Sequence, residues 1–209
     1  MARMFRSATA ILTALTALAW LIAVLSGQNG YAAAALGFIP ARLSGAQPPW
    51  PSVPVFVTPL TATLVHASLL HLATNLVVLL WCGNAVERAL GRTSFIVIYL
   101  VGAYAAAAAQ WLSDPHGIVP MIGASGAISA VMAGFALSFG RPHMFTRNIR
   151  LNRWLHIGHL LIAWVVIQVM VGWVAGGQGF LLATPAHIGG FVAGLLLQRP
   201  LLLWKYRKA

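Results

Sequence analysis

Six long apolar stretches run along this chain of 209 residues, and they limit its possible folds more than any other feature. A helix needs about 20 apolar residues to cross the hydrocarbon core of a bilayer. Soluble domains usually carry about 25% charged residues, whereas here 7% are charged and 60% are hydrophobic. We therefore predict an all-α polytopic membrane protein, a single domain over residues 1–209, with six spans at about 7–26, 56–82, 94–112, 125–139, 156–175 and 181–198.

The few charged residues are distributed with a bias that predicts the orientation of these spans. If the N-terminus faces the cytoplasm, every lysine and arginine except Arg42 falls in a cytoplasmic segment. Membrane proteins retain positive charge on the cytoplasmic side. We therefore expect both termini to be cytoplasmic. We attribute the net charge of +11 to topology and to contact with the lipid bilayer, and not to a nucleic-acid partner.

Two segments between the spans, and the first apolar segment, need separate interpretation. The loop at 27–55 contains many prolines and glycines but stays apolar, which indicates a membrane-associated loop. The stretch 113–124 before the short fourth span is rich in the same residues and indicates a re-entrant loop. The first segment is either a retained span or a secretory signal peptide, since Arg3 and Arg6 precede its apolar run.

Polar residues at membrane depth usually face the interior of a bundle, and each is a candidate for function. His66, His71 and Asn75 lie in the second stretch, Ser125 opens the fourth and His187 opens the sixth. On a helix, His71 and Asn75 share a face, and His66 lies about 140° away from His71.

The inventory argues against a metal site and against an aspartyl protease. Zinc proteases need a His-Glu-x-x-His motif, but His66 and His71 are five apart with no acid nearby. An aspartyl protease needs two aspartates, and the chain has only Asp114. We expect no metal and no cofactor, while a structural role for His66 and His71, bonded to loop backbone, stays open.

Serine chemistry fits the inventory better. Ser125 needs a base within hydrogen-bonding reach, and His187 begins its span on the same side of the membrane. Small residues at intervals of four follow both residues, which lets two membrane helices pack closely; they are Gly126, Ala130 and Gly134, and Gly190 and Gly194. The pattern predicts a Ser125–His187 dyad.

An oxyanion site can also be assembled. A serine at a helix N-terminus offers free backbone N–H groups, and the side chains of His71 and Asn75 can donate hydrogen bonds. Gly123 and Gly126 frame Ser125 and are expected to let a substrate backbone approach it closely.

These motifs resemble those of the rhomboid family of intramembrane serine proteases, in its six-span bacterial form. They occupy a core of about 56–198 and read, in order, His66-x4-His71-x3-Asn75, Gly83-x3-Glu87-x3-Gly91, Gly123-Ala124-Ser125-Gly126 and Ala186-His187-x-Gly189-Gly190.

The resemblance implies a nucleophile, Ser125, activated by His187 without an acid, and an oxyanion hole from His71, Asn75 and the Ser125 backbone. His66 would support the site. Glu87 would be a structural acid that could pair with Arg88 or Arg92. The implied substrates are transmembrane helices of other proteins, and the implied location is the bacterial cytoplasmic membrane.

The chain departs from the family pattern at two places. Val57-Thr58 stands where members often have Trp-Arg, and Ser129 stands where many have an aromatic residue that stacks on the histidine. We do not expect Ser129 to be the nucleophile, because it lies one turn deeper and lacks the glycine frame. A catalytically silent relative that binds transmembrane helices is the alternative. A transporter is the third hypothesis. It would need an intramembrane acid or an internal repeat, and neither is visible in the sequence.

Overall fold

The computed structural model describes residues 7–141, 144, 146–177 and 182–207. Within these ranges the chain is helical, with no strand beyond an isolated bridge between Phe38 and Met121. The helices are α1 (Ala8–Leu25), α2 (Asn29–Leu36), α3 (Pro40–Leu43), α4 (Thr58–Thr61), the 3-10 turn η2 (Ala62–Leu64), α5 (Leu69–Val78), the π turn η3 (Leu79–Gly83), α6 (Asn84–Leu90), α7 (Arg92–Ser113), α8 (Ser125–Phe139), α9 (Ile149–Gly177) and α10 (Thr184–Lys205).

The long helices confirm the predicted all-α membrane bundle. In the described part of the chain, five are long and apolar enough to cross a membrane: α1, the continuous run from α5 to α6, α7, α9 and α10. The remaining one of the six expected spans, the fourth in chain order, is α8, which is shorter at 15 residues and has the predicted limits.

The start predicted for the second span was wrong. The continuous helix begins at Leu69 and not near residue 56. Val65 is extended, and Ser68 caps the new helix by accepting a hydrogen bond from the His71 backbone N–H at 3.2 Å. Since His66 precedes this cap, it does not lie on the helix, and the predicted helical rotation between His66 and His71 does not apply.

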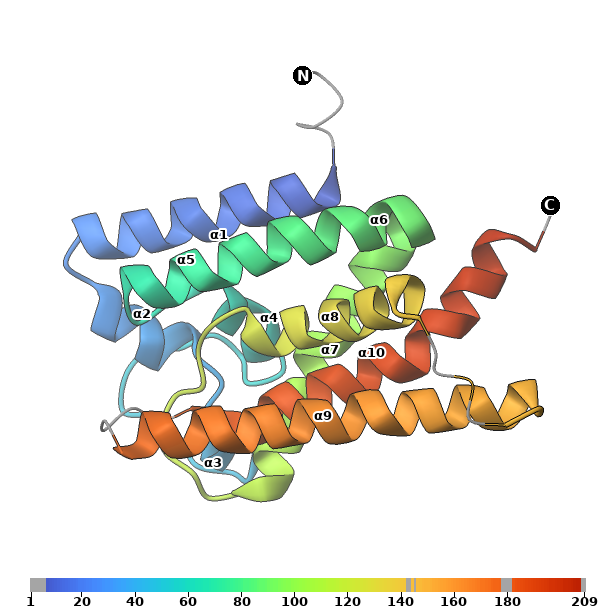
Figure 1. Ribbon diagram of the computed structural model, residues 1–209. Helices are drawn as coiled ribbons and strands as arrows, with labels where there is room; N and C mark the ends of the chain where they lie inside the picture. Colours follow the sequence, from blue (N-terminus) through green and yellow to red (C-terminus); the bar gives the residue numbers. More distant parts are fainter. Residues whose placement is uncertain (1–6, 142–143, 145, 178–181, 208–209) are drawn as a thin grey trace.

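Helix α8 packs against α7 and α10 through small residues, as the sequence predicts. It crosses the centre of the bundle (Figure 1), where Ala130 and Val131 are fully buried. A Cβ atom on Gly190 would collide with the carbonyl oxygen of Gly126, and one on Gly194 with that of Ala130. The backbones of α8 and α10 therefore touch directly.

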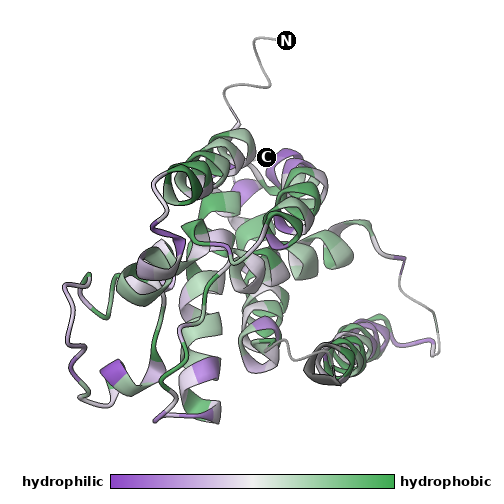
Figure 2. Ribbon diagram, turned by 90° about the vertical axis from the view of Figure 1, so that its left-hand side faces the viewer, coloured by the Kyte–Doolittle hydropathy of each residue, from purple (hydrophilic) through white to green (hydrophobic). Residues whose placement is uncertain are grey.

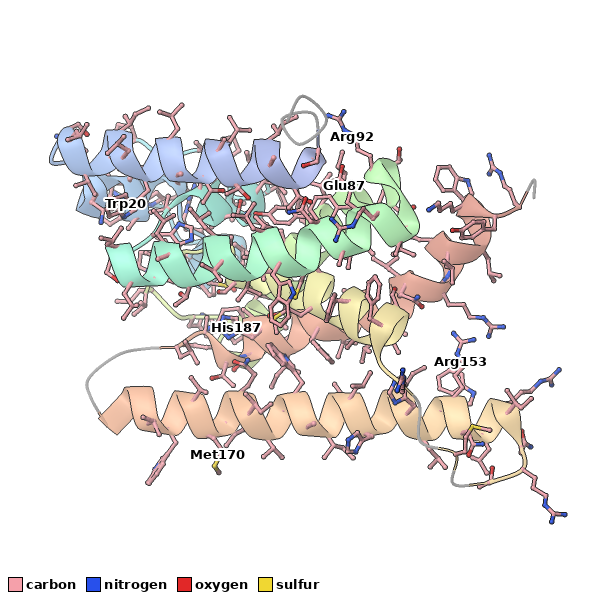
Figure 3. All side chains as sticks on the ribbon, turned by 45° about the horizontal axis from the view of Figure 1, so that its top comes forward. Trp20, Glu87, Arg92, Arg153, Met170 and His187 are labelled. Atoms are coloured by element: carbon pink, nitrogen blue, oxygen red, sulfur yellow. The ribbon has the colours of Figure 1, made fainter. Side chains whose placement is uncertain are left out.

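Glu87 forms hydrogen bonds that hold the start of α1 against the bundle. Its carboxylate accepts hydrogen bonds from the Ala8 N–H at 2.8 Å, the Thr9 N–H at 2.9 Å and the Thr9 hydroxyl at 2.7 Å. A carboxylate at a helix N-terminus satisfies free N–H groups and complements the helix dipole. The acid is structural, but its hydrogen-bond partners lie at the start of α1, near which Figure 3 shows Glu87. No ion pair joins it to Arg88 or Arg92 among the described residues, so the expected pairing was wrong.

The first loop and the approach to α8 are joined by backbone hydrogen bonds. Phe38 and Met121 exchange two, at 3.0 and 2.8 Å, and the Gly123 N–H donates to the Ala62 carbonyl at 2.9 Å. The approach to α8 is therefore held by protein on one side, as expected of a non-helical segment between spans. Contact of the 27–55 loop with the membrane interface stays a prediction.

Helix α9 stands at the edge of the bundle. Figure 2 views it end-on, set apart from the other long helices. In its most apolar 18-residue window only 6% of the residues are buried, against 44% for α10. The interior contacts of α9 therefore fall on a few positions.

We expect the contact between α8 and α10 to tolerate no side chain at residue 190. In Gly190→Ala the new Cβ would meet backbone of Gly126, which cannot rotate away, so the helices must separate at a cost of about 1–3 kcal/mol. The free energy of unfolding in a detergent titration measures this. Gly158→Ala on α9 is the control, because a Cβ there meets nothing within 4 Å; equal stability of the two variants would contradict the prediction.

Candidate active site

Ser125 is the first residue of α8, and a tight backbone turn leads into it. Gly123 has φ of +107°, a left-handed conformation that favours glycine. The Ser125 hydroxyl lies 2.7 Å from His187 Nε2. The structure thus brings together the two residues that the sequence analysis paired, which lie 62 positions apart in the chain and on different helices.

His187 lies in the first turn of α10, and its other ring nitrogen is also engaged. Nδ1 lies 2.7 Å from Gln168 Oε1 on α9. Since an amide oxygen can only accept, Nδ1 carries the proton and Nε2 is left free to accept from the Ser125 hydroxyl. Both His187 and Gln168 are buried.

Sequence reasoning missed Gln168. Its signal was present, because it is an uncharged polar residue within the apolar run Ile162–Val174. Polar groups at membrane depth usually face the bundle interior. The expected dyad is therefore extended by a third, neutral side chain.

A second contact from α9 holds the backbone of the same histidine. Trp164 Nε1 donates to the His187 carbonyl oxygen at 3.3 Å. The indole also stacks on Phe191 of α10, with centroids 4.8 Å apart and planes 11° from parallel. Trp164 and Gln168 lie one helical turn apart, so one face of α9 forms hydrogen bonds with both the main chain and the side chain of His187.

His71 and Asn75 lie beside the serine, as expected from their spacing. A Cβ on Gly123 would lie 2.7 Å from His71 Nε2 and 3.7 Å from the Ser125 hydroxyl, so ring, glycine and serine are neighbours. The Asn75 amide donates one hydrogen bond to the His71 carbonyl at 2.8 Å. Its second N–H remains available to another acceptor.

His66 supports the backbone just before Ser125. Its Nε2 accepts from the Ala124 N–H at 3.4 Å, and its ring meets that of His71 edge-on at 4.8 Å. The side chain is fully buried. These contacts match the loop-bonding role that the sequence left open for it.

The two glycines around Ser125 serve the protein's own packing. The open side of Gly123 is filled by the His71 ring, and a Cβ on Gly126 would lie 2.5 Å from Ala106 Cβ on α7. Gly126 therefore makes room for α7, and its expected role in the approach of a substrate backbone stays a prediction.

A cavity of about 160 Å³ opens beside the serine and histidine. It lies between α5, α8 and α9, and Figure 3 shows His187 in this region, between α9 and α5. Its lining residues are Thr74, Asn75, Val78, Ser125, Ile128, Ser129, Met132, Trp164, Gln168 and His187. The site is an apolar chamber with a small number of converging polar groups, which is the usual make-up of a ligand site.

The Rhomboid domain family matches residues 55–204, which include every residue of this candidate site. The chain belongs to the rhomboid family. It is an integral multi-pass membrane protein, as its apolar helices indicate.

Curated relatives support this placement. The chain is 29% identical over 136 residues to rhomboid protease GluP of Bacillus subtilis, covering 65% of this chain and 24% of that protein. It is 30% identical over 135 residues to rhomboid protease GlpG of Pectobacterium atrosepticum, covering 64% and 44%. It is 28% identical over 144 residues to RHOMBOID-like protein 4 of Arabidopsis thaliana, covering 69% and 34%. The chain thus spans less than half the length of each of these relatives.

Ser129, the residue that departs from the rhomboid pattern, is turned to its own helix. Its hydroxyl donates to the Ser125 carbonyl at 2.7 Å, one turn back along α8. A hydroxyl bonded in this way cannot stack on an imidazole. In this rhomboid the contacts that orient His187 come from α9 instead.

We expect Gly123→Ala to cost more than backbone strain alone. An alanine at positive φ is strained by about 1–2 kcal/mol, and here its Cβ would also lie 2.7 Å from the His71 ring. Gly45→Ala is the matched control, since Gly45 has φ of +101° but open space around it. Unfolding free energies should rank wild type above Gly45→Ala and Gly45→Ala above Gly123→Ala; a reversed order of the two variants would contradict the ring contact.

Proposed function

We propose that this rhomboid is an intramembrane serine endopeptidase that cuts transmembrane helices of other proteins. The observation that carries the proposal is the 2.7 Å contact between the Ser125 hydroxyl and His187 Nε2 at a cavity within the helix bundle. The names of its bacterial relatives, which are rhomboid proteases, support the same reaction class.

In the first step Ser125 Oγ attacks the carbonyl carbon of the scissile peptide bond. Its proton passes to His187 Nε2, which is unprotonated because Gln168 holds the proton on Nδ1. The carbonyl oxygen then carries the negative charge of a tetrahedral intermediate.

Three groups near Ser125 can donate to that oxygen. The Ser125 N–H lies in the first turn of α8, where backbone N–H groups have no partner within the helix. The His71 ring and the second amide N–H of Asn75 complete the set. Each such donor contributes about 3–4 kcal/mol to the transition state.

Collapse of the intermediate breaks the C–N bond, and the His187 Nε2–H protonates the leaving amine. An ester between Ser125 and the first product remains. A water molecule, deprotonated by the same Nε2, attacks this ester, and the proton returns to the Ser125 oxygen as the second product leaves. The cycle uses no metal and no cofactor.

Gln168 acts in this scheme as a positioning residue. Its side-chain oxygen binds His187 Nδ1 and fixes the productive tautomer without adding charge in the membrane interior. With Trp164 it supplies the orientation that an aromatic residue at position 129 provides in many rhomboids.

The substrate class follows from the surroundings of the site. The cavity lies among apolar helices, between α5 and the sparsely buried α9, so a substrate can reach it from lipid if either helix moves aside. We further propose that the protein resides in a bacterial cytoplasmic membrane with both termini in the cytoplasm, in accord with its charge distribution.

We expect a fluorophosphonate probe, which reacts with activated serines, to label the wild-type protein in liposomes. Ser125→Ala and His187→Ala should abolish labelling, since the first removes the nucleophile and the second removes its base. Ser129→Ala is the control, because that hydroxyl lines the same cavity but bonds its own helix. A reconstituted transmembrane substrate should be cleaved by the same two forms that label, wild type and Ser129→Ala.

Two results would change the assignment. Equal labelling of wild type and Ser125→Ala would exclude Ser125 as the nucleophile. If no form labels or cleaves while an active rhomboid protease does under the same conditions, the silent helix-binding relative replaces the protease as the better interpretation.

A second experiment addresses Gln168. We expect Gln168→Leu to lower kcat by about 5- to 150-fold with KM little changed, which corresponds to about 1–3 kcal/mol for one hydrogen bond. Gln168→Glu should retain activity, because a carboxylate also accepts from Nδ1–H. The ¹⁵N NMR shifts of His187 report the tautomer directly: an unchanged tautomer in Gln168→Leu, or a parallel loss in both variants, contradicts the positioning role.

A further inference from the structure

A second cavity lies away from Ser125, at the end of the bundle where α7 begins and α10 ends. Its volume is about 310 Å³, and it is lined by residues 90–94 and by Trp204, Lys205 and Arg207. In Figure 1 the last turns of α6 and of α10 lie at this same end. Two membrane-spanning helices have their termini here, so the cavity lies at the depth of lipid headgroups.

The lining of this cavity is strongly basic. It contains Arg92, Lys205 and Arg207 and no acid. The nearest acid along the chain is Glu87, whose two oxygens are both occupied by the start of α1. Among the residues that the structure describes, no acid therefore neutralises these three cations.

Backbone N–H groups add to this positive field. Helix α7 has 22 residues and begins at Arg92 without a side-chain cap or an acid in its first turn. The N–H groups of residues 92–94 precede the first intrahelical bonds, and the described residues supply no other acceptor for them. Such a helix start favours a bound anion.

A buried hydroxyl at the same place lacks a partner. Ser94 is 1% exposed and lines the cavity, yet its Oγ has no hydrogen-bond partner among the described residues. Buried polar groups are nearly always bonded, and an exception calls for an explanation. An acceptor oxygen within the cavity would satisfy it.

Two of the remaining groups are already placed by contacts. Lys205 Nζ donates to the carbonyl oxygens of Arg88 and Ala89, at 3.3 and 2.7 Å, which joins α10 to the end of α6. The Arg207 guanidinium lies 5.0 Å from the Trp204 ring centroid. Trp is typical of the membrane–water interface, where its ring lies among headgroups.

We propose that this cavity binds the phosphate group of an anionic phospholipid. The free N–H groups of α7, the Ser94 hydroxyl and the cations would bind the phosphate oxygens, and Trp204 would contact the adjoining lipid. Phosphate is the ligand chemistry that free N–H groups, hydroxyls and arginines recognise together. The helix ends set the phosphate at the level of the headgroups. The site is independent of the proposed protease activity.

The test is native mass spectrometry of the full chain in detergent, with phosphatidylglycerol or phosphatidylcholine of the same acyl chains. We expect one phosphatidylglycerol to be retained in preference to phosphatidylcholine. Arg92→Gln and Ser94→Ala should each weaken retention about tenfold, which is the loss expected for one hydrogen bond to a charged group. Arg150→Gln is the control, since Arg150 is exposed at the start of α9 and outside the lining.

The possible results distinguish a lipid phosphate from free phosphate, and a specific site from general attraction to the surface. If inorganic phosphate alone raises the unfolding temperature of wild type but not of Arg92→Gln, and phosphatidylglycerol is not retained, the lipid assignment is overturned in favour of free phosphate. Equal weakening by Arg150→Gln would mean general surface attraction and would overturn the site. Because Ser94→Ala removes a hydroxyl with no partner, its lipid-free stability should match wild type, so lost binding cannot be assigned to misfolding.

Discussion

The direct backbone contact between α8 and α10 is the interaction on which the rest of the structure depends. Gly190 and Gly194 lie against the carbonyl oxygens of Gly126 and Ala130, so these helices approach more closely than side chains would permit. Ser125 and His187 occupy the first turns of the two helices. Their 2.7 Å contact follows from that close approach, and one methyl group at residue 190 would push the helices apart.

The sparsely buried helix α9 controls the state of the histidine. Gln168 and Trp164 bind the side chain and the backbone of His187, although few residues of α9 are buried. Both contacts depend on the packing of α9 against α10, so the tautomer of His187 depends on the position of α9.

The local features of the site were predictable, while its long-range partners were not. The limits of α8, the close contact of α8 with α10 and the neighbourhood of Ser125, His71 and Asn75 follow from spacing and from small-residue patterns. The start of the second span was misjudged because residues 56–68 are apolar yet form short turns that end at the Ser68 cap. Glu87 was recognised as structural, but its partner lies 78 residues away at Thr9, beyond the reach of local charge pairing.

The sequence by itself determined that this is a helical membrane protein with a rhomboid motif set, because apolar length, charge bias and motif spacing are local properties of the chain. Only the tertiary structure decided which polar side chains meet. Gln168 reaches His187 because α9 packs on α10, and Arg92, Ser94 and Lys205 line one cavity because α7 begins where α10 ends. Such meetings depend on how helices cross, which the periodicity of a single helix does not encode.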